Sequence, residues 1–268
     1  MAMRRLILMG LLLASGAATA ELPELKLAWS DEFSVDGRPD ETKWDYERGF
    51  VRNQEWQRYT TRNAYCSNGW LVIEARKDPR LTSASVITKG KMSFGYGVLE
   101  IRAKFEAKGD LWPALWMLGD GVPDCPWPRC GEIDLFEYYD DSVLANLCWA
   151  DSSSPDSGQQ KWNTKKIPLK TFLAEDPEWK TKWHVWRLDR TPDHIVLSLD
   201  GKVLNSQMQA FARNNFAAKP VFPFREKMYL LMNLAVKHHE FDALEPAEYP
   251  ARFLVDYVRF YEYAQSAK

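Results

Sequence analysis

Three acidic side chains, Glu132, Asp134 and Glu137, stand close together in the segment GEIDLFEY. On a regular β-strand alternate side chains share a face, so Glu132 and Asp134 would point one way and Glu137 the other. A one-residue bulge near Leu135-Phe136 would return Glu137 to the side of the other two. We therefore expect a bulged strand that presents all three carboxyl groups on one surface.

Three carboxylates crowded on one strand repel one another, and a strand shaped only by folding would avoid this arrangement. The arrangement suits chemistry in which the acids titrate differently. A retaining glycosidase needs one ionised nucleophile and one protonated acid, with carboxyl groups roughly 5–5.5 Å apart. Repulsion and partial burial separate two pKa values in this way. The alternatives are a solvated acidic face or a calcium site, although calcium usually recruits loop oxygens.

The elements that must carry these acids are mostly strands. Apolar and polar residues alternate through several segments, and one segment, 228–236, is almost continuously apolar, as in a strand buried on both faces. Short helices are expected only at 168–180 and 207–218. This pattern predicts an all-β antiparallel sandwich or jelly roll. The other expected strands are 69–76, 97–107, 183–188, 195–199 and 253–263.

The 268-residue chain has an ordinary globular composition, with 46% hydrophobic and 27% charged residues. The beginning of the chain differs in composition from the rest. Arg4 and Arg5 precede a short apolar run, and small residues follow it as far as Ala18-Thr19-Ala20. This order is typical of a secretory signal peptide. We expect a signal peptide at 1–20, a single domain at 21–268, and a secreted or periplasmic protein.

The formal net charge is −2, which does not favour nucleic acid or an anionic membrane as a partner. We expect no membrane association after cleavage of the signal peptide, and a monomer. The chain holds twelve tryptophans. They suit either a large β core or a cleft in which indole rings stack on sugar rings, and composition leaves both readings open.

An ordered set of motifs over almost the whole mature chain resembles glycoside hydrolase family 16, the group of laminarinases, agarases and carrageenases. No single motif carries the likeness; the order of the set does. The matching segments are WSDEF (29–33), NQEWQRYT (53–60), TKGK (88–91), EIRAK (100–104), LWPALWML (111–118), GEIDLFE (131–137), YLLMNLAV (229–236) and VDYVRFY (255–261).

The resemblance implies a concanavalin A-like jelly roll with a concave substrate cleft. It implies Glu132 as nucleophile, Glu137 as acid/base and Asp134 as the residue that modulates both. No cofactor is implied for catalysis. The resemblance also implies that sugar subsites are lined by Trp112 and Trp116, with Asn53 and Glu55 nearby, and that a structural calcium ion is held by Glu32, Gly69 and Asp256.

Two departures from the family pattern bear on the substrate. Many laminarinases carry Thr-x-His after the catalytic strand, where this chain has Asn146-Leu147-Cys148. The segment Lys237–Glu240 replaces a pair of glycines and an aromatic residue. We expect an endo-acting hydrolase of a β-linked polysaccharide, with laminarin-type β-1,3-glucan as substrate. The alternatives are a β-galactan (agarose-like) hydrolase, a transglycosylase, or a non-catalytic carbohydrate-binding jelly roll; the intact acids favour the enzyme.

Overall fold

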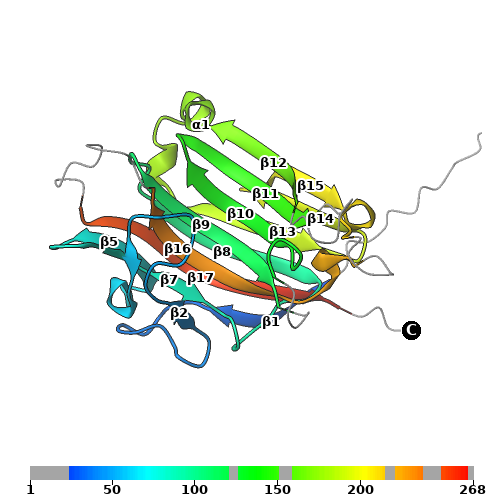
Figure 1. The fold of residues 1–268 in the computed structure, drawn as a ribbon, viewed down its shortest axis with the longest axis horizontal. Coiled ribbons are helices and arrows are strands. Elements are labelled where there is room, and N and C mark those ends of the chain that lie inside the picture. Colours follow the sequence, from blue (N-terminus) through cyan, green and yellow to red (C-terminus); the bar gives the residue numbers. More distant parts are fainter. Residues whose placement is uncertain (1–23, 121–125, 151–158, 215–220, 238–248, 265–268) are drawn as a thin grey trace, which may run out of the picture.

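The computed structural model describes residues 24–120, 126–150, 159–214, 221–237 and 249–264. Two β-sheets stack face to face (Figure 1). The seven-stranded sheet has the order β12-β11-β10-β9-β16-β7-β2. Its strands are β2 (Asp45–Glu47), β7 (Ser85–Ile87), β9 (Leu111–Gly119), β10 (Glu132–Tyr139), β11 (Ser142–Ala150), β12 (Gln160–Pro168) and β16 (Met228–Val236).

The second sheet has ten strands, and its main path runs β15-β14-β13-β8-β17-β5-β6-β3, with β1 on β17 and β4 on β5. Its strands are β1 (Leu25–Asp31), β3 (Arg58–Tyr59), β4 (Ala64–Ser67), β5 (Trp70–Lys77), β6 (Leu81–Ser83), β8 (Gly97–Phe105), β13 (His184–Arg190), β14 (His194–Leu199), β15 (Lys202–Met208) and β17 (Ala251–Tyr263). The single described α-helix is α1 (Leu169–Glu175), and short 3-10 turns lie at Thr61–Asn63, Trp179–Thr181, Gln209–Phe211 and Pro223–Arg225.

The residue pattern of each strand matches its place in the sandwich. β16 lies in the middle of its sheet, between β9 and β7, and all nine of its residues are buried. In β8, from Leu99 onward, buried side chains alternate with half-buried ones. β12 lies at the end of its sheet and its residues are exposed or half-buried. β16 is therefore almost wholly apolar, whereas the edge strand β12 is mostly polar.

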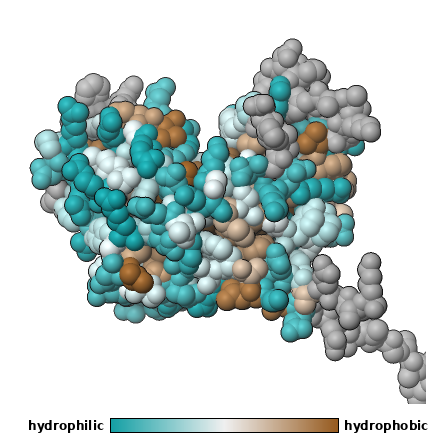
Figure 2. Space-filling model, turned by 90° about the horizontal axis from the view of Figure 1, so that it is seen from below, coloured by the Kyte–Doolittle hydropathy of each residue, from teal (hydrophilic) through white to brown (hydrophobic). Residues whose placement is uncertain are grey.

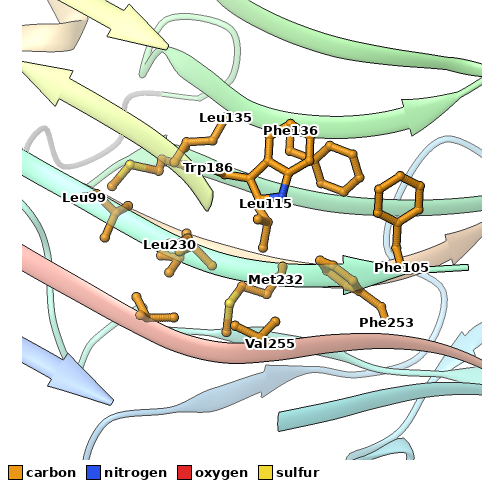
Figure 3. Close-up of a cluster of buried hydrophobic side chains, with 14 of the residues drawn as sticks. Leu99, Phe105, Leu115, Leu135, Phe136, Trp186, Leu230, Met232, Phe253 and Val255 are labelled. Atoms are coloured by element: carbon orange, nitrogen blue, oxygen red, sulfur yellow. The ribbon is translucent and has the colours of Figure 1, made fainter. Parts of the chain in front are cut away.

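The hydrophobic core fills the space between the sheets (Figure 3). Phe136 of β10 stacks on Trp186 of β13 with ring centroids 4.2 Å apart. Phe105 packs against the same Phe136 at 4.8 Å. Ile133 and Leu135 of β10 belong to this core as well. The apolar side of β10 thus anchors the strand that carries the acidic residues.

The all-β antiparallel sandwich predicted from the sequence is confirmed, with one short parallel pair between β3 and β6. No helix within the described ranges is long and apolar enough to cross a membrane. The expected signal peptide at 1–20 lies outside the described residues, as does most of Lys237–Glu240.

Candidate active site

The bulge predicted near Leu135-Phe136 is present in β10. Pairing with β11 follows a regular register from Glu132 to Asp134 and resumes at Glu137 opposite Leu144. Pairing with β9 shifts at the same place. The extra residue lets the adjacent Leu135 and Phe136 both enter the core, and it brings Glu137 to the face that already carries Glu132 and Asp134.

This face forms the floor of a cavity of about 570 Å³. The molecule is notched between two lobes (Figure 2). The three acids line the cavity together with residues from β9, β11, β12, β16 and the loop before β3. The other lining residues are Arg52, Asn53, Glu55, Trp112, Ala114, Trp116, Leu118, Trp127, Tyr139, Leu144, Asn146, Gln160, Trp162 and Asn233.

Glu132 lies at the start of β10 and is half-buried. Its carboxylate accepts a hydrogen bond from the indole N–H of Trp127 and is hydrogen-bonded to Asp134. Burial raises the pKa of Glu132, while these two hydrogen bonds and the cation of Arg52 oppose the rise. Each opposing contact favours the ionised form, and together these contacts limit the rise in the pKa of Glu132.

Glu137 accepts two hydrogen bonds, one on each carboxyl oxygen. The indole N–H of Trp112 donates to Oε1 at 2.9 Å, and the amide of Asn146 donates to Oε2 at 2.8 Å. Burial is the largest influence and raises the pKa of Glu137 to about 7, and the negative charge of Glu132 adds to the rise. Glu137 therefore holds a proton near neutral pH, where a free glutamic acid would not.

Asp134 lies between the two glutamates and is 2% exposed. Burial raises the pKa of Asp134 well above its usual value, and the charges of Glu137 and Glu132 raise it further. The hydrogen bond between Asp134 and Glu132 raises the pKa of Asp134 further and lowers that of Glu132. The three neighbouring acids therefore differ in proton affinity, and such a difference is what double displacement at a sugar requires.

The four residues expected to bind sugar all line the cavity, in different ways. Trp112 is half-buried and contacts Glu137. Trp116 is only 7% exposed, and its indole N–H donates to Asn233 at 2.6 Å. Asn53 and Glu55 lie at the rim, where the Asn53 amide donates to Glu55 at 3.4 Å.

Several lining residues were not singled out from the sequence. Trp162, on the edge strand β12, is 42% exposed, and its place in a mostly polar segment was the signal that could have identified it. Trp127 lies just before β10 in a Pro-rich loop, whose path the sequence does not specify. The guanidinium of Arg52 lies 4.8 Å from the Trp116 ring and pairs with Glu47.

The residues expected to hold calcium do not fit that ion. Both oxygens of Glu32 accept hydrogen bonds from Arg259, at 2.9 and 2.8 Å. Asp256 is bound by Arg102, and Gly69 lies in the turn between β4 and β5. Each carboxylate is therefore neutralised by its own guanidinium. Within the described ranges no group of three His, Cys, Asp or Glu residues is arranged to hold a metal ion.

Comparison with known proteins agrees with this geometry. The chain is 32% identical over 274 residues to a beta-glucanase of Rhodothermus marinus. The alignment covers 97% of this chain and 93% of that relative. It is 30% identical to a keratan-sulfate endo-1,4-beta-galactosidase of Sphingobacterium multivorum over 92% of this chain and 57% of the relative's length.

Solved structures give the same likeness. The laminarinase from Rhodothermus marinus superposes with a TM-score of 0.74 and 33% identity, over 91% of this chain and all of that one. A structure from work on endo-acting O-glycanases of the human gut microbiota superposes with a TM-score of 0.76 and 29% identity, over 90% and 91% of the two chains. The model of glycosyl hydrolases family 16 matches residues 50–259. With its sandwich fold and its acidic cleft, the chain belongs to glycosyl hydrolases family 16.

Proposed function

We propose that this glycoside hydrolase is a retaining endo-enzyme in which Glu132 is the nucleophile and Glu137 is the acid/base. The observation that carries the proposal is the contrast between the two carboxyl groups in one cleft. Burial raises the pKa of both groups. Hydrogen bonds from Trp127 and Asp134 and the cation of Arg52 oppose the rise at Glu132, whereas the charge of Glu132 adds to the rise at Glu137, whose pKa reaches about 7. Two carboxyl groups that share a cleft but differ in proton affinity divide the roles of nucleophile and acid.

The reaction then follows in two steps. Glu137 gives its proton to the glycosidic oxygen as the bond from that oxygen to the anomeric carbon breaks, and a Glu132 oxygen forms a bond to the same carbon. Glu137, now ionised, takes a proton from water, and the water oxygen displaces Glu132 from the anomeric carbon. Two inversions leave the product with the configuration of the substrate. Asp134 donates a hydrogen bond to Glu132 and so lowers its basicity as a leaving group in the second step.

We infer that the substrate is a β-1,3-glucan of the laminarin type, cut at internal bonds. The Rhodothermus marinus relatives, a beta-glucanase and a laminarinase, support this substrate. The half-buried indole of Trp112 beside Glu137 and the exposed ring of Trp162 suit the apolar faces of glucose rings. A non-catalytic sugar-binding role is disfavoured, because binding alone gives no reason to bury three acids together.

A β-galactoside-containing glycan is the second candidate substrate. Asn146 and Cys148 occupy the positions at which many laminarinases have Thr and His, and Asn146 contacts Glu137 directly. A change so near the acid/base alters the surroundings of the sugar ring that reacts. The keratan-sulfate endo-1,4-beta-galactosidase relative supports this candidate.

We further propose that residues 1–20 direct export and that 21–268 form one domain, which acts as a secreted or periplasmic monomer. The basic and apolar character of the first segment supports export. The described strands join into two sheets around one core, which supports a single domain.

A substrate panel tests the proposed function. Laminarin, mixed-linkage glucan, agarose and keratan sulfate are incubated with the enzyme, and initial kcat/KM is compared. We expect laminarin to be cut fastest, early products to be β-anomers by NMR, and Glu132→Gln to lose several orders of magnitude in kcat while it still binds oligosaccharide. Faster cleavage of a galactan would replace the glucan assignment, and products that lengthen with time would indicate transglycosylation. Inverted products, or an active Glu132→Gln variant, would overturn the mechanism.

A further inference from the structure

Asn146 stands opposite Asp134 in the pairing of β10 with β11, in the middle of the acidic face. Its side chain is almost wholly enclosed, with the residue 4% exposed. The amide nitrogen donates to Oε2 of Glu137 at 2.8 Å, and a hydrogen bond from Asn146 also acts on Asp134. Asn146 thus connects the acid/base to the central acid without facing much of the open cleft.

The two hydrogen-bond partners of Glu137 differ in whether they can accept a hydrogen bond as well as donate one. The indole of Trp112 only donates, so it favours the ionised carboxylate at every stage. An asparagine amide carries donors on one side and an acceptor on the other. The amide oxygen Oδ1 of Asn146 is buried and has no hydrogen-bond partner. A buried acceptor without a partner is costly, and it is available for a proton that arrives nearby.

We propose that Asn146 is a positioning residue that follows the proton of Glu137 through the reaction. When Glu137 is ionised, the amide N–H₂ of Asn146 donates to Oε2. When Glu137 is protonated, rotation of the amide turns Oδ1 toward that oxygen, and Oδ1 accepts the carboxyl O–H. The carboxyl group therefore keeps a partner, and one orientation, in both steps. This proposal rests on the proposed role of Glu137 as the acid/base.

An amide suits this position for an electrostatic reason. Asn146 carries no charge at any working pH, so it can exchange donor for acceptor without adding a net charge beside the three acids. A carboxylate there would place a fourth negative charge beside Asp134 and Glu137. A histidine would add a second titrating group to the cleft. The amide changes its role by rotation alone.

The test compares Asn146→Ala, Asn146→Asp and Asn146→Thr with the wild type. For each, kcat and KM are measured against pH on the polysaccharide that the wild type cuts fastest, and on an aryl β-glycoside with an activated leaving group. Removing the donor raises the pKa of Glu137. In the Ala variant the alkaline limb of the plot of kcat against pH should therefore move to higher pH by roughly half to one pH unit. Its kcat on polysaccharide should fall about tenfold or more, with a smaller loss on the aryl glycoside, which needs little protonation.

The other variants separate positioning from simple structure. Asn146→Asp keeps the shape and adds a negative charge, so its alkaline limb should also move upward even if the Ala variant folds poorly. Asn146→Thr restores a group that donates and accepts, and should recover part of the lost kcat. KM should stay within about twofold throughout, because a residue so enclosed makes little contact with substrate.

Asn205→Ala is the matched control. The Asn205 amide donates to the backbone oxygens of Ala145 and Asn163, at 2.9 and 3.1 Å, and does not touch the acids. Its loss should lower the melting temperature and leave the pH profile unchanged. An unmoved alkaline limb in both the Ala and Asp variants, or equal losses on the two substrates, would overturn the role of Asn146. If Glu137→Gln kept full activity on polysaccharide, the proposed function itself would fail, whatever Asn146 does.

Discussion

At the scale of single residues, Glu137 illustrates how burial and charge combine. Burial and the neighbouring Glu132 both raise its pKa, and the hydrogen bonds from Trp112 and Asn146 offset only part of that rise. The resulting pKa, about 7, lies above the usual value for a glutamic acid. A general acid is most effective when its pKa is near the working pH.

The pH dependence of activity follows from this value. In the proposed mechanism Glu137 must be protonated to cleave the bond, so kcat/KM should fall tenfold per pH unit as the pH rises above about 7. Glu132 must be ionised, so activity should also fall in acid. The rate profile on an uncharged polysaccharide measures both limbs. An alkaline limb near pH 9 or above would assign the acid to another group.

The same raised pKa affects stability. Glu137 binds a proton more tightly in the folded protein than in the unfolded chain. Its contribution to the free energy of unfolding is therefore greatest below the ordinary pKa of 4.5, and this contribution is lost as the pH rises from there to about 7. Above pH 7 the folded protein contains a costly buried charge. Glu137→Gln should therefore be more stable than the wild type at pH 8, by about 1–3 kcal/mol, and nearly equal to it at pH 4.

Urea denaturation at the two pH values measures this difference. Asp189→Asn is a control on the other sheet, where the carboxylate is paired with Arg187. It should not be stabilised at pH 8. Equal stability of wild type and Glu137→Gln at pH 8 would mean that the charge of Glu137 is not costly in the fold.

At the scale of elements, the approach of β9 to the start of β10 positions Glu132. The backbone N–H of Gly119 donates to the carbonyl of Gly131 at 3.2 Å, just before Glu132. A Cβ on Gly119 would lie 2.1 Å from the carbonyl oxygen of Cys130, a distance that no real contact allows. The glycine is needed because two backbones meet there.

Gly119→Ala should therefore push β9 and β10 apart at this end. We expect a loss of about 1–3 kcal/mol in the free energy of unfolding, as in overpacked sites. We also expect kcat to fall by a larger fraction of its wild-type value than the free energy of unfolding does. Gly95→Ala is the control, because a Cβ there meets nothing within 4 Å and the backbone is unstrained. A Gly119→Ala enzyme with wild-type kcat would show that the strand ends tolerate separation.

The sequence predicts elements better than it predicts the contacts between them. The apolar segment 228–236 matches β16 in full, and the expected strand 97–107 is β8 with two residues fewer. The expected helix 168–180 is shorter, a seven-residue helix followed by a 3-10 turn at Trp179–Thr181. Alternation reports burial on one strand at a time. It gives no partner for a distant strand, so neighbours such as Trp116 and Asn233 emerge only from the pairing of β9 with β16.

The same limit applies to the site. The three acids were identified because their spacing on one strand is a local signal. The contact of Trp127 with Glu132 depends on a loop, and the contact of Asn146 with Glu137 depends on the register between two strands. Neither has a local signature. The ion pairs of Glu32 and Asp256 with arginines were missed for the same reason, because each joins residues more than a hundred positions apart.

At the scale of the whole molecule, the stacked rings of Phe136 and Trp186 join the two sheets behind the catalytic strand (Figure 3). Both rings are fully enclosed, and the indole nitrogen of Trp186 has no hydrogen-bond partner. Phe136 is part of the bulge that turns Glu137 toward the cleft. The core and the active site therefore depend on one another at this point.

Trp186→Ala should cost about 3–5 kcal/mol, the usual range for removing a large aromatic from a core, and should lower kcat because Phe136 loses its support. Trp186→Phe keeps a ring on Phe136 and removes the unpaired N–H, so its cost should be much smaller. Urea denaturation gives the free energies of unfolding. A cost below about 1 kcal/mol for Trp186→Ala would show that the sheets hold together without this contact.

The polar edge strand β12 has a consequence for colloidal behaviour. Among the described strands only β11 pairs with it, so its outer row of backbone donors and acceptors has no strand partner there, although the Asn163 carbonyl accepts a hydrogen bond from Asn205. Lys161, Lys165 and Lys166 stand along this strand, and all are exposed. Two copies that approached edge to edge would bring these ammonium groups together and repel. The strand that borders the cleft therefore also discourages ribbon-like aggregation.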